Sequence, residues 1–554
     1  MKQAVLEILE QVEQGRSLET VKGEISKKYK LKKMLTNIEM LNELSSEERK
    51  KYSALLITKP TRTASGVFPI AVMSAPIACK HGKCIFCPGG PDSIFGDVPQ
   101  SYTGNEPSTM RAMRANYDSY LIAFNRLEQY IILGRIPEKC EVIIQGGTFP
   151  SFPKEYQETF VRDIYKAMND FSTMFFKDDE FLFEVFKEFF ELPGDINNSE
   201  RAKRLTDKIL KLKENTTLEE EQLKNESSKV RCVGLTIETK PDWGRTVQGN
   251  EMLRLGCTRV EVGVQSTSEE ILKNLNRGHT VQETIESFRE LKDLGFKINA
   301  HVMLGLPGSD KEKDLASLKE LFSNPDFRPD LLKVYPCLVM RGTPLFELWK
   351  RGSYKEISAR QAAETIAEFK RFVPEYVRIM RVQRDIPSTV IDAGPIKTNL
   401  RQEVEEICKE RGIKCRCIRC REAGTKKLTN PLIKIQGYEA SQGKEFFISL
   451  EENDLLVGYC RLRFPSQSLR EEITTETAIV RELHIYSNAI AVGTKDEKSL
   501  QHRGFGKQLM LEAERIAKEH AKKKMLVISG VGVKNYYRKI GYEKEGPYMA
   551  KRLE

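Results

Sequence analysis

Residues 78–90 read Ala-Cys79-Lys-His81-Gly-Lys-Cys84-Ile-Phe-Cys87-Pro-Gly-Gly90, which places three cysteines within nine residues of one loop. Three thiolates can hold three irons of a four-iron cluster and leave the fourth iron open for a small ligand. A structural zinc ion prefers four ligands, and His81 could supply the fourth. The stretch therefore predicts an open [4Fe–4S] cluster, with a zinc site or inert thiols as the alternatives.

Short β-rich runs alternate with helical segments in the following part of the chain. They span residues 67–75, 141–145, 233–237, 259–264, 298–304 and 331–335. Such alternation predicts a parallel sheet. Residues of chemical interest follow each run, and barrels carry function at the carboxyl ends of their strands. We therefore predict an α/β fold with an incomplete, TIM-like (β/α)6 barrel that is open to a large substrate, although a doubly wound sheet shows the same alternation.

The composition indicates several domains in a reducing compartment. A chain of 554 residues is too long for one hydrophobic core. The longest apolar run, residues 67–78, contains two prolines, so we expect no membrane span or signal peptide and a cytoplasmic location. Cytoplasmic thiols stay reduced, so clustered cysteines indicate metal binding. Two clusters hold seven of the 12 cysteines: Cys79, Cys84, Cys87 and Cys408, Cys415, Cys417, Cys420.

We divide the chain into four regions. They are a basic helical region at 1–60, the barrel at 61–400 with a helical insertion at 152–229, a cysteine-rich linker at 401–430, and a second α/β unit at 431–554. In the linker, the spacing of Cys415, Cys417 and Cys420 is typical of structural zinc. Cys408, Cys337 or a more distant residue could be the fourth ligand.

The last region predicts a second α/β fold with an anion site. Strands are expected at 446–450, 455–462, 478–485 and 525–529, and Gln501-His-Arg-Gly504-Phe-Gly506 opens a helix that runs to about residue 518. Glycines at a helix start expose backbone N–H groups to a pyrophosphate. Together with Tyr536-Tyr537-Arg-Lys-Ile-Gly541-Tyr542, this pattern resembles the GCN5-related N-acetyltransferase fold, in which the glycine loop binds coenzyme A and a tyrosine meets the thioester.

Two basic segments could bind a polyanion, and the net charge of +10 favours such a partner. The first contains Lys22, Lys27, Lys28, Lys30, Lys32 and Lys33, and the second contains Arg371, Arg378, Arg381 and Arg384 with interleaved aromatic residues. Lysines contact phosphates, and arginines also stack on bases. Each segment alone is equally compatible with a solvated helix face or with ordinary ion pairs.

The combination of an iron–sulfur barrel and an acetyltransferase is similar to the catalytic subunit of Elongator, the elongator complex protein three family, in its archaeal and bacterial type. The resemblance rests on the residues at 87–93, 100–107, 110–115, 146–149, 238–242, 341–345 and 536–542. It implies a radical S-adenosylmethionine (SAM) enzyme that modifies the wobble uridine in the anticodon stem-loop of tRNA. Acetyl-CoA would supply a two-carbon unit to C5 of uridine 34.

The resemblance also implies roles for individual residues. Cys79, Cys84 and Cys87 would hold the cluster, and SAM would contact Gly146, Gly147, Glu238, Lys240 and Gln265. Acetyl-CoA would contact Lys139, Glu482, Leu483, His484, Ile485, Gln501, Gly504, Phe505, Gly506, Lys507 and Tyr537, of which Lys139 and Tyr537 are the expected catalytic residues. Zinc would be held by Cys415, Cys417 and Cys420, a cluster that eukaryotic members lack. The tRNA would contact Lys27, Lys28, Lys32, Lys33, Arg378, Arg381 and Arg384.

The implied chemistry explains why both halves are needed. Carbon 5 of uracil is too poor a nucleophile for ordinary acyl transfer, whereas a carbon radical can add to it. A deoxyadenosyl radical would take hydrogen from the acetyl methyl group, the new radical would add to C5 of a splayed-out uridine, and thioester hydrolysis would leave a carboxymethyl group. An electron donor is required, and the protein could act alone or as a homodimer.

Two other classes of function remain open. The chain could acetylate protein lysines with the barrel as a scaffold, but the retained cysteine triad argues against this reading. It could also be a non-enzymatic tRNA-binding module, but such a module would not need the glycine loop or Tyr537.

Overall fold

The computed structural model describes residues 1–56, 65–194, 198–397, 399–424, 426, 428–486 and 504–554. The chain begins with a helical region that has its own apolar core. Its helices are α1 (Lys2–Glu13), α2 (Leu18–Lys28), α3 (Asn37–Glu43) and α4 (Ser46–Leu56). Helix α3 starts with a capping box, in which Thr36 and Glu39 each accept the other's backbone N–H. No helix in the described part of the chain is long and apolar enough to cross a membrane.

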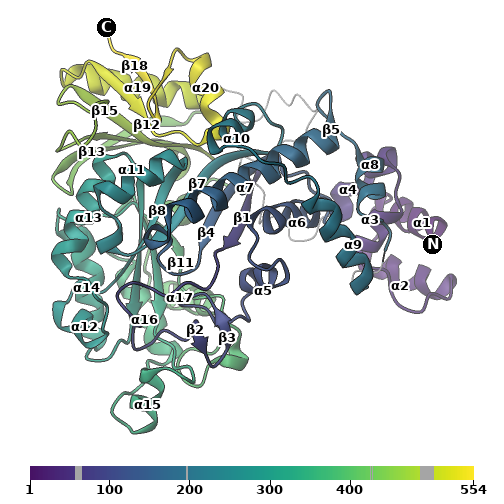
Figure 1. Cartoon of the computed structure of the whole chain (residues 1–554), viewed down its shortest axis with the longest axis horizontal. Coiled ribbons are helices and arrows are strands. Elements are labelled where there is room, and N and C mark those ends of the chain that lie inside the picture. The colour runs from purple at the N-terminus through teal and green to yellow at the C-terminus, as the bar shows by residue number, and fades with distance from the viewer. Residues whose placement is uncertain (57–64, 195–197, 398, 425, 427, 487–503) are drawn as a thin grey trace.

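Seven parallel strands form the central sheet, and they follow one another in chain order (Figure 1). They are β1 (Val67–Met73), β4 (Lys139–Gln145), β7 (Arg231–Thr239), β8 (Cys257–Gln265), β9 (Lys297–Leu304), β10 (Leu331–Pro336) and β11 (Arg378–Arg381). A doubly wound sheet reverses its strand order, so this order identifies an open barrel. The six predicted strands are present. Sequence reasoning missed β11, because its two arginines suggested a charged surface.

Helices cover the outside of this sheet. The main ones are α6 (Ser119–Ile132), α7 (Lys154–Phe175), α11 (Thr246–Arg254), α13 (Val281–Asp293), α14 (Lys311–Ser323) and α16 (Ala359–Phe369). Shorter elements sit at the ends of the strands: β2 (Gly90–Ser93), β3 (Gly96–Val98), α5 (Pro107–Arg114), α12 (Glu269–Asn274) and α15 (Pro344–Lys350). Helices α17 (Leu400–Glu410) and α18 (Ile418–Arg421) connect the barrel to the C-terminal domain.

Helices also fill the long connection between β4 and β7. After α7 come β5 (Phe176–Lys177), β6 (Glu180–Phe181), α8 (Phe183–Phe189), α9 (Ser199–Leu210) and α10 (Leu218–Asn225). Phenylalanines form their core, with ring centroids 4.8 Å apart for Phe171 and Phe175 and 4.7 Å apart for Phe186 and Phe190. The Arg49 guanidinium lies 3.8 Å from the centre of the Phe183 ring, so this segment joins the N-terminal region to the barrel.

The C-terminal domain is a second, mostly antiparallel sheet. Its strands are β12 (Leu432–Ala440), β13 (Gly443–Glu452), β14 (Leu455–Phe464), β15 (Thr477–Ile485), β16 (Lys524–Val527), β17 (Glu543–Glu545) and β18 (Tyr548–Arg552), and its helices are α19 (Phe505–Glu519) and α20 (Lys534–Lys539). Strands β15 and β16 pair in parallel only from Thr477 to Val480, and no further pair joins their described residues. The carboxyl half of β15 is therefore free to line a site.

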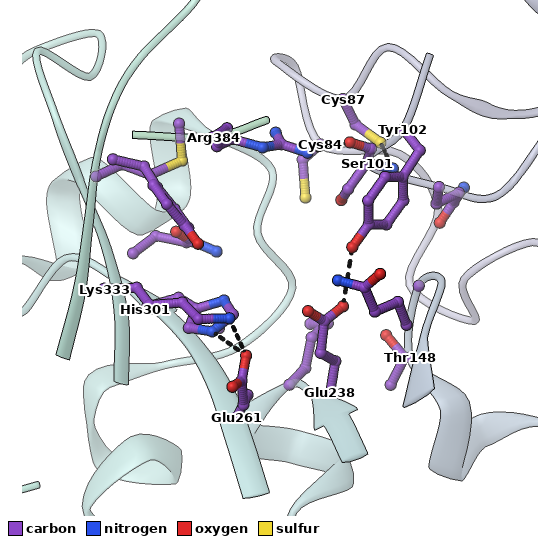
Figure 2. Close-up of a pocket in the computed structure, with 18 of the residues that line it drawn as sticks. Cys84, Cys87, Ser101, Tyr102, Thr148, Glu238, Glu261, His301, Lys333 and Arg384 are labelled. Atoms are coloured by element: carbon purple, nitrogen blue, oxygen red, sulfur yellow. Dashed lines mark hydrogen bonds and ion pairs between the residues drawn. The ribbon is translucent and has the colours of Figure 1, made fainter. Parts of the chain in front are cut away.

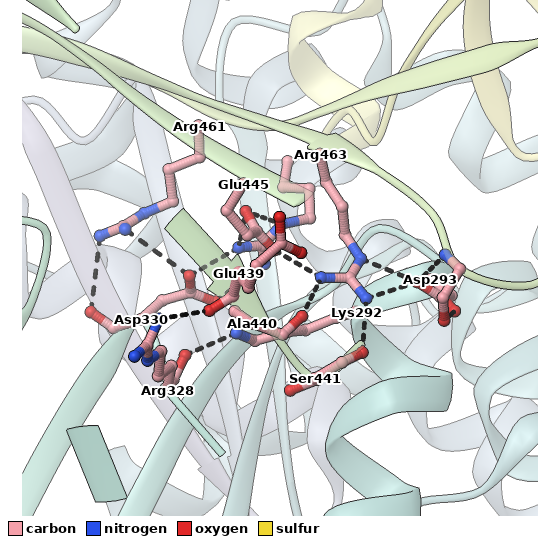
Figure 3. Close-up of polar contacts among 12 residues, drawn as sticks. Lys292, Asp293, Arg328, Asp330, Glu439, Ala440, Ser441, Glu445, Arg461 and Arg463 are labelled. Atoms are coloured by element: carbon pink, nitrogen blue, oxygen red, sulfur yellow. Dashed lines mark hydrogen bonds and ion pairs between the residues drawn. The ribbon is translucent and has the colours of Figure 1, made fainter. Parts of the chain in front are cut away.

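The C-terminal domain packs on the amino ends of the barrel strands (Figure 3). Arg481 on β15 donates to the carbonyl oxygen of Phe296, which directly precedes β9, at 2.8 Å. It also contacts Asp330, the residue before β10, at 2.6 Å. The cysteine loop follows β1 and therefore lies at the carboxyl end. The two expected sites thus face opposite ends of the same parallel strands.

Buried ion pairs connect the two domains at this contact (Figure 3). Three arginines and three carboxylates take part, each at most 1% exposed: Arg461, Arg463, Arg481, Asp293, Asp330 and Glu445. The Arg463–Asp293 pair measures 2.5 Å, and Glu445 bridges Arg463 and Arg481 at 2.9 and 2.8 Å. Buried charges of this kind are tolerated only when they are paired, so the two domains depend on each other for charge compensation.

Candidate active site

A pocket of about 140 Å³ opens at the carboxyl ends of the barrel strands (Figure 2). It contains the cysteine loop and residues at or near the carboxyl ends of six neighbouring strands, β4 and β7 to β11. The expected cluster and SAM residues that line it are Cys79, Cys84, Cys87, Gly147, Glu238, Lys240 and Gln265. These residues come from positions 186 apart in the chain, and parallel strands in consecutive order bring them together.

The spacing of the loop cysteines distinguishes between the two metal centres. Of the described residues, only Cys415, Cys417 and Cys420 bring three metal-binding side chains within 4.8 Å of one another. Tetrahedral zinc requires sulfur atoms about 3.8 Å apart, because each Zn–S bond is about 2.3 Å long. In a four-iron cluster each thiolate binds a different iron, so the sulfur atoms lie farther apart. Cys79, Cys84 and Cys87 do not form such a compact group, which fits the cluster. His81 Nε2 lies 3.4 Å from Cys84 Sγ, but the two do not complete a compact set of three ligands.

Polar groups surround the three sulfur atoms. The Ser101 backbone N–H donates to Cys87 Sγ at 3.2 Å, and Arg277 Nη1 donates to Cys84 Sγ at 3.5 Å. Thr148 Oγ1 lies 3.6 Å from Cys79 Sγ. Hydrogen bonds and a nearby cation favour thiolates, which are the metal-binding form of cysteine. Burial nevertheless raises the pKa of Cys79 and of Cys87, so the bound metal itself must supply most of the stabilisation of these thiolates.

Glycines allow the chain after β4 to approach the cysteine loop. Gly146 and Gly147 have φ angles of +113° and +74°, which side chains rarely permit. A Cβ atom on Gly146 would lie 3.3 Å from Met73 Sδ, and one on Gly147 would lie 3.8 Å from Cys79 Sγ. Any larger residue here would crowd the space beside the cluster.

The remaining expected SAM residues also face this space. The Tyr102 hydroxyl donates to Glu238 Oε2 at 3.2 Å, as Figure 2 shows, and this bond fixes the carboxylate. Lys240 forms an ion pair with Asp242 at 3.3 Å, and burial lowers its pKa. Gln265 ends β8 with a φ angle of +70°, which turns the chain at the rim of the pocket.

Sequence reasoning missed three ionisable residues that line the pocket from inside the strands. Glu261, His301 and Lys333 lie on β8, β9 and β10, and each is surrounded by apolar residues in the sequence. A lone charged side chain within an apolar strand was the available signal, because such a group needs a buried partner or a ligand.

The expected acetyl-CoA residues gather around the start of α19. Gly504 precedes this helix with a φ angle of +74°, and Gly506 faces β15 and α20. A Cβ atom on Gly506 would lie 2.9 Å from the Tyr536 hydroxyl and 3.8 Å from Leu483. Phe505 is half-buried and Lys507 exposed. Gln501 lies outside the described residues.

Tyr537 and Lys139 lie in different surroundings. Tyr537 is 6% exposed in the core of the C-terminal domain, and burial raises the pKa of its hydroxyl. Lys139 begins β4, next to β7, whose first residues contact the segment Val531–Val533 before α20. Burial lowers the pKa of Lys139. Lys139 is thus near the boundary between the two domains.

The β15 segment Glu482–Ile485 presents polar groups to the barrel. Glu482 contacts Arg461 at 2.9 Å and Lys297 at 3.8 Å. Burial alone would raise the pKa of Glu482, but these two cations lower it to about 2. Burial lowers the pKa of His484 to about 4, so this residue is neutral at pH 7.

The linker cysteines form a compact group beside β11. Hydrogen bonds from Cys415 and Cys420 lower the pKa of Cys417, which favours a metal-binding thiolate. Lys370 Nζ lies 3.8 Å from Cys420 Sγ. Cys337 lies in a separate apolar cluster that contains Cys84 and Cys87, so it is not the fourth ligand of this group. Cys408, on α17, is buried and is not part of the compact group.

The lysines of the N-terminal region differ in their exposure to solvent and in whether they form ion pairs. Lys28 pairs with Glu7 at 2.6 Å and Lys33 with Glu39 at 2.7 Å. Lys27 and Lys32 are exposed, and no described acidic residue lies within 4.0 Å of either. Lys22 is only 5% exposed and donates to Asn37 at 3.0 Å. The expectation that Lys22 belongs to an exposed basic patch is wrong, because its side chain is buried and hydrogen-bonded to Asn37 within the helical region.

The arginines of the second basic segment separate into two groups. Arg381 and Arg384 line the pocket, where Arg384 donates to the carbonyl oxygen of Ser101 and Arg381 pairs with Asp385 at 2.6 Å. Arg378 contacts Glu422 and the Tyr486 hydroxyl at the opposite end of β11. The segment is therefore not one continuous surface.

Known families match almost the whole chain. Residues 1–64 match the ELP3 N-terminal domain, residues 76–321 the Radical SAM superfamily, residues 329–410 the Radical_SAM C-terminal domain, and residues 418–542 the Acetyltransferase (GNAT) family. The first of these matches covers the helical region that carries the exposed lysines.

Individual relatives agree with these matches over most of their length. The tRNA uridine(34) acetyltransferase of Methanocaldococcus infernus is 45% identical, across 99% of this chain and 98% of that protein. Elongator complex protein 3 of Saccharomyces cerevisiae is 42% identical, across 95% and 90%. The solved structure of archaeal Methanocaldococcus infernus Elp3 with an N-terminal deletion matches with a TM-score of 0.72 at 40% identity, covering 89% of this chain and 100% of that one. The chain therefore belongs to the family of Elongator complex protein 3 and the archaeal tRNA uridine(34) acetyltransferases.

Proposed function

We propose that this enzyme builds the carboxymethyl group at C5 of the wobble uridine of tRNA from acetyl-CoA, by SAM-dependent radical chemistry. The observation that carries the proposal is the coexistence, in one chain, of an open cysteine triad in a barrel pocket and a glycine-opened helix in an acetyltransferase domain. We further propose that it works in the cytoplasm on the anticodon stem-loop, with an external electron donor, either alone or as a homodimer.

In this proposal the barrel pocket prepares the radical. Cys79, Cys84 and Cys87 would hold the [4Fe–4S] cluster, which, when bound, supplies one electron to cleave SAM. Gly146 and Gly147 leave room for SAM beside Cys79, and Glu238 and Gln265 offer acceptors for its amino and ribose groups. Lys240 would neutralise its carboxylate. Lys240 is buried and Glu238 and Gln265 are half-buried, so each electrostatic contact is stronger here than in water.

The C-terminal domain would bind acetyl-CoA between the carboxyl half of β15 and the start of α19. Backbone N–H groups at Gly504, Phe505, Gly506 and Lys507 would receive the pyrophosphate, and the helix dipole favours that anion. Glu482, Leu483, His484 and Ile485 would line the pantetheine arm. Tyr537 and Lys139 would orient the thioester; Gln501 is proposed from the sequence alone.

The decisive experiment combines purified, anaerobically reconstituted protein with unmodified tRNA, SAM, acetyl-CoA and a reductant. Mass spectrometry of the digested nucleosides should detect 5-carboxymethyluridine, and omission of either SAM or acetyl-CoA should abolish it. If labelled acetyl-CoA instead transferred its acetyl group to lysine peptides without SAM, the protein-acetyltransferase reading would replace this one. Tight tRNA binding without any product would support a binding module.

Binding of tRNA should depend on Lys27 and Lys32, two of the exposed lysines of the N-terminal region that form no ion pair with a described residue. Replacing Lys27 and Lys32 by glutamine removes two phosphate contacts, so the slope of log Kd against log salt should fall by about 1.5. Filter binding at several salt concentrations measures this slope. The control variant, Lys203→Gln with Lys518→Gln, removes two exposed lysines elsewhere. An equal loss of slope in both double variants would show that Lys27 and Lys32 contribute only net charge and do not contact the tRNA phosphates.

The linker cysteines should hold a structural zinc ion. Cys417→Ser should lose about one zinc ion per chain, because the two cysteines that remain are too few ligands to hold zinc. Metal analysis of the purified variant measures the loss, and iron content should stay unchanged because the cluster loop is intact. Cys140→Ala, which alters a buried cysteine of β4, serves as the matched control. Full zinc retention in Cys417→Ser would refute this assignment.

A further inference from the structure

A carboxylate–histidine pair lies inside the pocket, next to the strand ends that would hold SAM. Glu261, His301 and Lys333 occupy adjacent strands: Lys333 is in register with His301, and Glu261 is in register with Asn299, two residues before His301. All three line the pocket, and Figure 2 shows them converging on one point. Their side chains are 1%, 15% and 8% exposed, so His301 is the most accessible of the three.

Hydrogen bonds fix the state of this pair. His301 Nε2 lies 2.8 Å from Glu261 Oε2, and Lys333 Nζ contacts the same oxygen. Asn299 Nδ2 donates to Glu261 Oε1 at 3.1 Å, and Arg259 Nε lies 3.8 Å from that oxygen. Burial alone would raise the pKa of Glu261, but Lys333, His301 and Arg259 hold it well below the usual range. The carboxylate is therefore ionised and can only accept hydrogen bonds.

The ionised carboxylate dictates which nitrogen of His301 carries the proton. Burial and Lys333 lower the pKa of His301, so the ring is neutral at pH 7. Its single N–H must then be Nε2–H, which donates to Glu261, and Nδ1 keeps a free lone pair. The described residues provide no hydrogen-bond donor to Nδ1. The ring is an oriented base whose acceptor nitrogen has no hydrogen-bond partner among the described residues.

The other polar groups in the pocket are less suited to accept a proton. Lys333 pairs with Glu261, and this carboxylate raises its pKa above the normal value, against the effect of burial, so it is an ammonium ion. Glu261 is 1% exposed and fully engaged. Glu238 already accepts from Tyr102. The charged and titratable groups that face His301 are Glu238, Glu261, Lys333 and Tyr335. Behind them, Arg259 acts on Glu261 and Arg381 acts on Tyr335.

The proposed reaction requires such a base. When the acetyl-derived carbon radical bonds to C5 of uracil, C5 still carries its hydrogen and the unpaired electron moves to C6. One electron must leave C6 to a one-electron acceptor, such as an oxidised iron–sulfur centre. The C5–H bond then breaks, its electron pair restores the C5=C6 double bond, and the proton goes to a base. Neither SAM nor acetyl-CoA supplies that base.

We propose that His301 is the general base that takes the C5 proton of the uridine adduct through Nδ1, and that Glu261 is the residue that positions it. This inference rests on the proposed function. The dyad is built as in other enzymes that use a carboxylate to orient a catalytic histidine, and His301 lines, from within β9, the pocket that also contains the expected SAM residues.

The main test compares His301→Gln with wild type. The glutamine amide can still donate to Glu261, so the pocket should keep its shape, but it has no basic nitrogen. We expect deoxyadenosine formation in the presence of tRNA and acetyl-CoA to stay within about two-fold, while 5-carboxymethyluridine falls about 100-fold, the usual range for loss of a general base. With tRNA deuterated at uridine C5, a kinetic isotope effect on product should appear in the variant. His520→Gln, on α19 in the other domain, is the control.

Three further readouts separate a base from a structural residue. Product formation by wild type should fall at low pH as His301 becomes protonated, with unit slope, and the variant should be flat in the same range. Imidazole should rescue His301→Gly. Nitrogen-15 NMR of histidine-labelled protein should assign His301 to the Nε2–H tautomer, and Glu261→Gln should alter that signal and lower the yield of product.

These experiments distinguish a failure of the proposed function from a failure of the role proposed for His301. If wild type makes no 5-carboxymethyluridine, the proposed function fails. If wild type makes the product and His301→Gln makes it as fast, with no isotope effect and an unchanged pH profile, the role of His301 as base is wrong. If His301→Gln loses deoxyadenosine formation and product together and imidazole does not rescue His301→Gly, His301 is structural.

Discussion

Cys84→Ala is expected to abolish SAM cleavage and tRNA modification together. Cys84 is buried, and its Sγ accepts a hydrogen bond from Arg277 Nη1 at 3.5 Å. Its replacement leaves two thiolates in the loop and removes the sulfur that faces the guanidinium. Two thiolates cannot hold a four-iron cluster with one open iron. The anaerobically reconstituted variant should contain little iron and lack the brown colour of the cluster, and deoxyadenosine should fall to background.

A matched variant tests whether this effect belongs to the cluster. Cys257 is equally buried but begins β8, at the opposite end of that strand from the pocket. Cys257→Ala should keep its iron and its SAM cleavage. Wild-type iron content and SAM cleavage in Cys84→Ala would show that the loop does not hold the cluster.

The second large effect is expected on stability. Asp330→Ala removes the carboxylate that accepts from Arg481 at 2.6 and 2.8 Å and from the Ile298 backbone N–H at 2.9 Å. Arg481 and Arg461 would remain buried without their main counter-charge, which typically costs about 3–5 kcal/mol. The free energy of unfolding, measured by denaturant titration, should fall by that amount, with earlier separation of the two domains. Lys50→Ala breaks an exposed ion pair with Glu180 and should leave the transition unchanged.

The same carboxylate should make stability depend on pH. Arg481 and Lys292 hold the pKa of Asp330 below the value of about 3.9 in an unfolded chain, although burial opposes them. Its contribution is therefore complete above about pH 4 and is lost as the pH falls through the folded pKa. Asp330→Asn should show a smaller loss of stability between pH 4 and pH 2 than wild type. Equal acid sensitivity in both proteins would indicate that other carboxylates dominate.

The position of the two candidate sites has a mechanistic consequence. The cysteine loop lies at the carboxyl ends of the barrel strands, and the acetyltransferase domain packs on their amino ends. The radical and the thioester must nevertheless meet. The buried ion pairs hold the two domains in a fixed relative position. A variant that weakens these pairs should therefore also reduce the yield of product per SAM cleaved.

Local sequence determined the parts of this protein whose chemistry depends on near neighbours. The three cysteines at 79, 84 and 87 lie on one loop, and a candidate ligand set within nine residues can be recognised without knowledge of the fold. The six predicted barrel strands and the helix after Gly504 are likewise encoded locally, by apolar runs, glycine and periodicity. These segments would be recognised in any fold.

Tertiary structure alone decided the features that depend on distant residues. Arg461, Arg463 and Arg481 alternate along two strands and would be assigned to solvent, yet the barrel buries them. Lys22 is buried in the same way by helix packing. Glu261 and His301 are 40 residues apart and meet only because β8 and β9 pair in parallel and turn these side chains into the barrel. The face of a strand that becomes interior is set by the whole sheet, so sequence pattern could identify the strands but not the base inside them.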